Sequence, residues 1–124
     1  MNYLIKNIPN KNEIEKILNY FETLNNNIDF SKIELDILKV IVFIINKFEK
    51  NKEYTKQFVM SKATPLILNS FDELKKYNKK LLDLCLEIVN LYDEAGVYNT
   101  ENLKNMFLNY IYENKKAKDF FLDL

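Results

Sequence analysis

The sequence predicts an all-α protein, a compact stack of about six to seven helices that forms a single domain over residues 1–124. Its apolar residues recur three and four positions apart, the spacing that is typical of amphipathic helices. The chain contains one glycine and two prolines, too few for the many turns of a β-protein. Hydrophobic residues make up 48% of the 124 positions, enough for a core that needs no metal ion or disulfide.

The segment from Ile33 to Phe48 is expected to form a central buried helix. It is apolar on nearly every face, and a helix of this kind is usually enclosed by other helices. Ser31 and Glu34 stand at its start as S-x-x-E, the pattern of a capping box, in which the two side chains bind amides of the first turn. The other helices are therefore expected to pack around this one.

The first helix is expected to begin at Asn12, whose side chain can cap it, with Glu15 three residues on. Its apolar stripe consists of Ile14, Ile17, Leu18, Phe21 and Leu24. After the central helix, residues 54–60 are long enough for two helical turns. Thr64 followed by Pro65 then predicts a new helix, because an amide in the first turn would be unpaired anyway and proline lacks it.

A second buried helix is expected over residues 79–93, where leucines cover most of the helix circumference and Asn78 can serve as the cap. Gly96 stands where a left-handed residue would end that helix. Thr100 can cap the last long helix. The tail with Phe120 and Phe121 is either a linear motif for another protein or a segment that folds back on the core; we favour the second, since exposed phenylalanines promote aggregation.

The composition argues against an enzyme. All eighteen basic residues are lysines, and the abundance of Asn, Ile and Lys indicates an AT-rich genome. Without histidine there is no imidazole base, and a metal site would have to use carboxylates or Cys85. Cys85 lies within a predicted buried helix, where cysteine behaves as a small hydrophobe. We expect no catalytic residues, no cofactor and no metal.

Charge and hydropathy predict an intracellular protein, cytoplasmic or nuclear. The formal net charge is zero, so no overall field attracts nucleic acid. A single cysteine cannot form an internal disulfide, which fits a reducing compartment. The longest apolar run, Val40 to Ile45, is far shorter than the roughly 20 residues that cross a bilayer. Polar residues from Lys6 to Lys16 leave no room for the apolar part of a signal peptide, so we expect no membrane partner.

Residues 34–71, ELDILKVIVFIINKFEKNKEYTKQFVMSKATPLILNSF, resemble the armadillo repeat. In that family a long helix ends near an asparagine, a short helix ends in a small-residue and proline turn, and another helix follows. Here Asn46 ends the long helix, Ala63-Thr64-Pro65 is the turn and Leu66 opens the next helix. Asn90 ends the following long helix, about one repeat of roughly 40 residues later. The resemblance covers roughly residues 30–91 and implies a right-handed superhelix; a related non-repeating bundle is the alternative.

The same resemblance implies a peptide-binding groove. The amides of Asn46 and Asn90 would pair with the backbone of an extended peptide, since an amide both donates and accepts. Val42 and Leu86 stand where the family carries its groove tryptophans, and the glycine of its turn is absent. Because asparagine is abundant throughout the chain, chance also explains both matches.

Four lysines cluster before the second buried helix: Lys75, Lys76, Lys79 and Lys80. They could meet phosphates or an acidic partner, although solvated lysines at a turn between helices are common. The absence of arginine removes the side chain best suited to reading bases, so nucleic acid is disfavoured.

The expected function is a non-catalytic protein–protein interaction module that binds a peptide, a partner helix or another copy of itself. Two further resemblances give alternatives. The helix layout is similar to the N-terminal domain of transcription elongation factor S, which implies a transcription-associated binder of disordered motifs. One buried helix among amphipathic ones also resembles virus-encoded inhibitors of apoptosis, helical antagonists of host proteins, but the glycine-containing groove motif of that family is missing.

Overall fold

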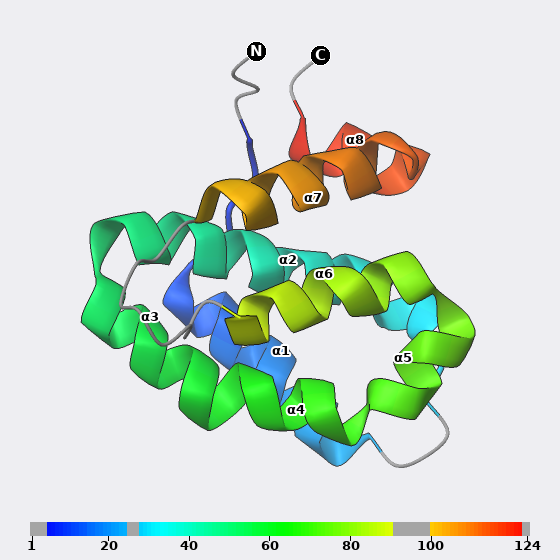
Figure 1. Cartoon of the computed structure of the whole chain (residues 1–124), viewed down its shortest axis with the longest axis horizontal. Coiled ribbons are helices and arrows are strands. Elements are labelled where there is room, and N and C mark those ends of the chain that lie inside the picture. Colours follow the sequence, from blue (N-terminus) through cyan, green and yellow to red (C-terminus); the bar gives the residue numbers. More distant parts are fainter. Residues whose placement is uncertain (1–4, 25–27, 91–99, 123–124) are drawn as a thin grey trace.

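The structure is a computed structural model that describes residues 5–24, 28–90 and 100–122. It confirms a compact all-α fold (Figure 1). The helices are α1 (Lys11–Thr23), α2 (Phe30–Lys50), α3 (Lys52–Phe58), the π-helical turn η1 (Val59–Ala63), α4 (Thr64–Asn69), α5 (Phe71–Tyr77), α6 (Lys79–Asn90), α7 (Thr100–Tyr112) and α8 (Lys115–Phe121). Among the residues described, the one extended pairing is an isolated antiparallel bridge between Ile5 and Leu122.

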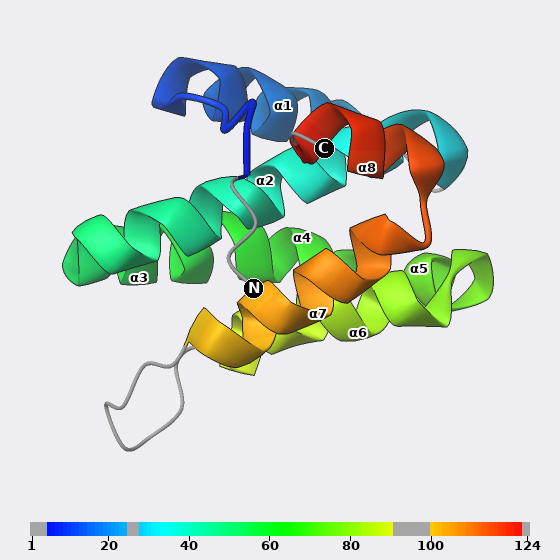
Figure 2. The same cartoon turned by 90° about the horizontal axis from the view of Figure 1, so that it is seen from above.

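Helix α2 is the centre of the molecule, as the sequence predicted. Figure 1 shows α7 and α8 along one side of α2 and α1 and α4 along the other, and Figure 2 shows the same bundle from above. Side chains from nearly its whole circumference are buried, among them Leu38, Ile41 and Ile44, and α2 contacts α1, α3 and α7. A helix that is apolar all round is stable in water only when neighbours cover every face, and this arrangement supplies them.

The caps of α1 and α2 differ from the predicted ones. Asn10 caps α1, because its side-chain oxygen accepts the amide of Glu13 at 2.8 Å, and Asn12 already lies inside the helix. Asp29 caps α2 by accepting both the amide and the hydroxyl of Ser31, at 3.1 and 2.6 Å. Asparagine, aspartate and serine cap about equally well, so the sequence could not choose between neighbours. The capping box was therefore wrong, and the Glu34 carboxylate has other partners.

Thr64 and Pro65 do not start a new helix. Thr64 has helical dihedral angles, φ −58° and ψ −47°, and α3, η1 and α4 follow one another without a break. The backbone amide of Thr64 donates to the carbonyl of Val59, five residues earlier, which is the hydrogen bond of a π-helix. This wider turn lies directly before Pro65, which has no amide hydrogen to donate. The break comes instead at Ser70, where ψ is 12°, and α5 begins after it.

The second buried helix, α6, begins as predicted. The side chain of Asn78 accepts the amides of Lys80 and Leu81 at 3.0 and 3.3 Å. Leu81, Leu84 and Ile88 are among its buried residues. The position of Gly96 lies outside the residues described, and α7 begins at Thr100.

The tail folds back on the core, as expected. Phe121 is fully buried and packs edge-on against Phe107 of α7, with ring centroids 5.5 Å apart. The amide of Lys6 donates to the carbonyl of Phe121 at 2.7 Å, and the Asn7 side chain donates to the carbonyl of Phe120 at 2.7 Å. Asn7 has φ +60°, a left-handed conformation that asparagine tolerates better than most residues. Residues 5–7 and helix α8 thus close the same side of the bundle.

Candidate functional site

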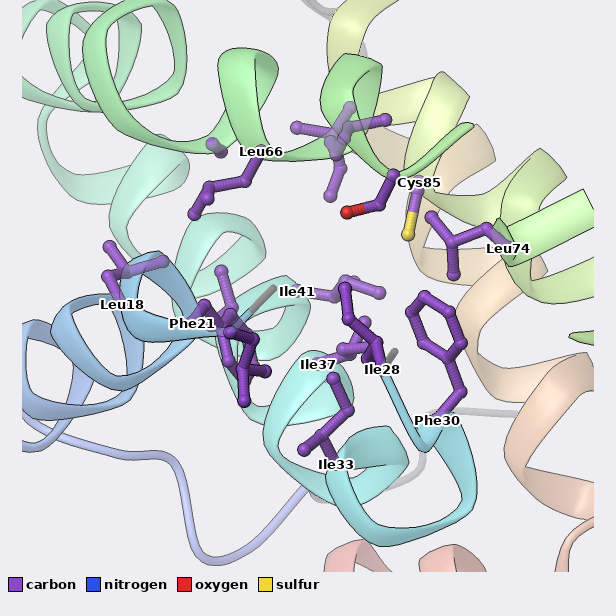
Figure 3. Close-up of a pocket in the computed structure, with 16 residues that line it drawn as sticks. Leu18, Phe21, Ile28, Phe30, Ile33, Ile37, Ile41, Leu66, Leu74 and Cys85 are labelled. Atoms are coloured by element: carbon purple, nitrogen blue, oxygen red, sulfur yellow. The ribbon is translucent and has the colours of Figure 1, made fainter. Parts of the chain in front are cut away.

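An apolar groove lies between α1 and α4 (Figure 3). Its cavity has a volume of about 80 Å³. The floor is made of buried residues of α2, α4, α5 and α6: Ile33, Ile41, Ile67, Leu74, Cys85 and Ile88. The rim is made of half-buried residues: Phe21, Leu24, Ile28, Ile37, Leu66 and Ser70. Figure 3 shows the labelled side chains converging on one space from several helices.

The groove is open because its two walls pack on different helices. Helix α1 packs against α2, whereas α4 packs against α6. The stripe of α1 that packs through Ile14 and Ile17 turns toward the groove at Leu18 and Phe21 and continues beyond the helix to Leu24. Ser70 alone contributes a hydroxyl to a lining that is otherwise made of hydrophobic residues. Such a surface favours contact with apolar side chains and offers few partners to polar backbone groups.

A second hollow, of about 370 Å³, runs along the other side of α1 toward α3 and η1. Leu18 lines both hollows, so they adjoin. The second hollow is more polar than the groove. Besides apolar residues such as Ile14 and Phe58, it is lined by Glu15, Asn19 and Glu22 of α1 and by Gln57, Ser61 and Lys62 of the facing helix. Helix α1 therefore separates an apolar groove from a hollow of mixed polarity.

Glu34 is the centre of a polar cluster at the opposite end of α2 from α3. Its carboxylate accepts hydrogen bonds from the hydroxyl of Tyr77 at 2.7 Å, from the hydroxyl of Tyr110, and from the side-chain amide of Asn114 at 3.1 Å. Asn78 donates in turn to the Tyr110 hydroxyl at 3.2 Å. Because Asn78 caps α6 and Asn114 caps α8, this Glu34 cluster ties α2 to α5, α6, α7 and α8.

The two tyrosines of the Glu34 cluster hold their protons tightly. Burial, followed by the hydrogen bond to Glu34 and its negative charge, raises the pKa of Tyr77 to about 12. The same causes in the same order raise the pKa of Tyr110 as well. A tyrosine that stays protonated is a donor and no base, so we interpret the cluster as a structural link between helices.

The structure does not bring the four residues implied by the armadillo resemblance together on one open face. Val42 is 2% exposed and belongs to the core, and Leu86 and Asn46 are half-buried. Asn90 is exposed at the last position of α6. Helix α7 packs against both α2 and α6, the helices that carry the two asparagines (Figures 1 and 2). Binding of a peptide by Asn46 and Asn90 stays a prediction.

The four predicted lysines lie together at one turn. Lys75 and Lys76 end α5, Lys79 and Lys80 begin α6, and all four are exposed. Lys80 forms an ion pair with Glu113 at 2.9 Å, in which both side chains are largely exposed.

The described residues contain no group of three or more metal-ligating side chains. Burial raises the pKa of the Cys85 thiol to about 12, so this cysteine has little thiolate to act as a nucleophile or ligand. None of the helices in the described part of the chain has the length and hydrophobicity needed to cross a membrane.

Comparison with protein-family models, with curated proteins and with solved structures found no match for this chain. The resemblance to armadillo repeats thus stays a prediction from the sequence.

Sequence reasoning missed both the groove and the Glu34 cluster. Helical spacing predicts the apolar stripe of α1, but nothing in that spacing distinguishes the buried Ile14 and Ile17 from Phe21 and Leu24, which border the groove. Glu34 was assigned to a cap, although an acidic residue early in an otherwise apolar helix needs partners of its own. Those partners, Tyr77, Tyr110 and Asn114, lie 43 to 80 positions away in the chain.

Proposed function

We propose that this protein is a non-catalytic interaction module that binds an amphipathic helix of a protein partner in the apolar groove between α1 and α4. The observation that carries the proposal is the groove itself, with its buried floor, its half-buried rim and a lining in which Ser70 alone is a hydroxyl residue. An apolar hollow of this kind is the usual site for the anchoring side chains of a helical ligand.

A helix is favoured over an extended peptide because of its backbone. An extended peptide in an apolar groove needs a hydrogen-bond partner for each backbone amide and carbonyl. Of the side chains that line the groove, Ser70 alone offers a hydroxyl, which is too few partners. The other route for extended ligands is addition to a sheet edge, and the described residues contain an isolated bridge in place of a sheet. A helix pairs its own backbone groups and presents apolar side chains alone.

The adjoining second hollow fits a ligand with one polar face. A helix laid along α1 would turn its apolar face toward Phe21, Leu24 and Leu66, and the neighbouring face would meet the carboxylates of Glu15 and Glu22. The cavity is small, about 80 Å³, so it fits anchoring side chains, and the rim would cover the rest of the apolar face.

The chain's own tail is an unsuitable occupant. Phe121 is already buried against Phe107, and Leu122 is 2% exposed on the side closed by residues 5–7 and α8. Residues 115–122 are thus already packed elsewhere, and we propose a helix of another protein as the occupant.

The test is selection of binders from a displayed library of helical peptides with randomised surfaces. We expect the selected peptides to carry apolar residues at positions i, i+3 or i+4, and i+7, and to shift the amide NMR signals of Phe21, Ile37 and Leu66. The change Leu66→Glu should weaken their binding by at least about tenfold, because it places a charge in the apolar rim.

Leu68→Glu is the matched control. It introduces the same side chain in the same helix, but Leu68 is 57% exposed and does not line the groove. Circular dichroism and melting curves establish that both variants fold. If both weaken the selected peptides equally, or if neither does, the groove is not the binding site. Binding of acidic, disordered peptides from a second, unstructured library in place of the helical ones would instead support the transcription-associated alternative.

A further inference from the structure

The fold extends the predicted cluster of lysines with residues from a distant part of the chain. Helix α8 begins next to the turn between α5 and α6, and its first two residues are lysines. The resulting basic end consists of Lys75, Lys76, Lys79, Lys80, Lys115 and Lys116, all of them exposed. These are six of the eighteen lysines of the chain, so a third of its basic side chains lie at this end.

The basic end surrounds a hollow of about 520 Å³. Lys80 lines it from one segment of the chain, and Lys115 and Lys116 line it from the other. The Glu34 cluster holds the two segments in place, because the caps Asn78 and Asn114 both belong to it. The relative position of these lysines is therefore set by the core and does not depend on an exposed loop.

Two acidic residues also line the hollow, and both already have partners. The Glu34 carboxylate accepts three hydrogen bonds from Tyr77, Tyr110 and Asn114. Glu113 pairs with Lys80, but the two side chains are 67% and 70% exposed, and an ion pair of this kind contributes little. Lys80 thus remains able to exchange Glu113 for an acidic group of a ligand.

We propose that the basic end binds an acidic segment of a protein partner, with carboxylates entering the hollow between Lys80, Lys115 and Lys116. The proposal rests on charge complementarity and is independent of the groove between α1 and α4. Several lysines spread around a concave surface suit a chain with successive acidic side chains, which can reach into the hollow as well as over its rim.

The surface suits nucleic acids and membranes less well. The whole sequence lacks arginine, and the two tyrosines at the hollow are already engaged: Tyr77 stacks on Phe30 with ring centroids 5.6 Å apart, and Tyr110 is buried. Phe30 covers one face of the Tyr77 ring and Tyr110 is buried, so little aromatic surface is left for stacking on a base. A planar bilayer surface would meet the exposed lysines at the rim and leave the hollow itself unfilled, whereas side chains of a peptide can enter it.

The experiment measures binding of a fluorescent peptide of alternating Glu and Ser by anisotropy, at low and at physiological ionic strength. The test variant changes Lys79, Lys80, Lys115 and Lys116 to Gln together. The control variant changes four exposed lysines elsewhere, Lys6, Lys16, Lys50 and Lys52, to Gln, which alters the net charge by the same amount. We expect the test variant to lose at least about tenfold in affinity and the control less than about twofold.

Each possible result of this experiment has a different meaning. Equal losses of affinity in the two variants would show that the peptide responds to net charge alone, and they would overturn the proposal. Tighter binding of a single-stranded oligonucleotide, or of vesicles with anionic lipid, than of the Glu-Ser peptide would assign the basic end to that partner instead. Leu66→Glu should leave binding of the Glu-Ser peptide unchanged, so failure at one site does not bear on the other.

Discussion

The two sides of α2 carry similar apolar side chains but are covered differently. On the side of α7 and α8, Phe107 and Phe121 are both fully buried and pack edge to face. On the side of α1 and α4, Phe21 and Leu66 are half-buried and border a groove. The comparison teaches that an apolar stripe becomes core or binding surface according to whether another element covers it.

The closed side also has more polar links than the open side. The Glu34 cluster joins four other elements to α2 on the closed side, and the backbone amide of Lys6 and the side chain of Asn7 donate hydrogen bonds to carbonyls of α8. The groove side has an ion pair between Lys39 and Glu13, at 3.3 Å, linking α2 to α1. We therefore expect the closed side to determine stability and the open side to determine recognition.

The largest expected effect tests this division directly. Phe121→Ala should lower the free energy of unfolding by about 3 to 5 kcal/mol, because it leaves a cavity in a packed interior. Phe21→Ala, at the rim of the groove, should cost less than about 2 kcal/mol, because the side chain is already in contact with water. Urea denaturation of both variants measures the difference. Equal losses would mean that the groove side is packed as tightly as the tail.

An intermediate effect is expected from the Glu34 cluster. Glu34→Ala removes the acceptor of three hydrogen bonds and should cost about 1 to 3 kcal/mol, since the Tyr110 hydroxyl and its neighbours would be left partly buried without a partner. Glu15→Ala is the control, because Glu15 is exposed in the same bundle and its removal should change stability by less than about 0.5 kcal/mol. If the two variants unfold at the same urea concentration, the cluster does not hold the closed side together.

The smallest effect concerns alkaline pH. The pKa of Tyr77 is raised to about 12 in the folded protein, whereas an unfolded tyrosine titrates near its ordinary value of 10. Above that ordinary value the unfolded chain releases a proton that the folded protein keeps, so this contribution to stability is complete below about pH 10 and is lost as the pH rises toward about 12. Unfolding curves across this interval should show a steeper loss for the parent than for Tyr77→Phe. If the parent and Tyr77→Phe lose stability equally over this pH interval, Tyr77 does not contribute to the pH dependence.

Much of the fold could be predicted from residues close together in the chain. Helical spacing located the buried helices α2 and α6, and Asn78 was recognised as a cap, because these features depend on contacts within one or two turns. The predicted caps were wrong where the chain offers several equivalent capping residues close together, and Asn10 and Asp29 are the caps there. The predicted helix start at Thr64 and Pro65 failed for a similar reason. The π-helical turn that joins them to the preceding helix has no local sequence signature.

By itself, the sequence determined that this protein is all-α and that α2 is enclosed, because apolar periodicity acts locally, and it favoured a buried tail over an exposed one. Only the tertiary structure decided which apolar residues stay uncovered, which donors meet Glu34, and that Lys115 lies beside the same hollow as Lys80. The reason is physical. Packing brings together segments that are far apart in the chain, and the residues of one segment do not show which distant helix will pack against them.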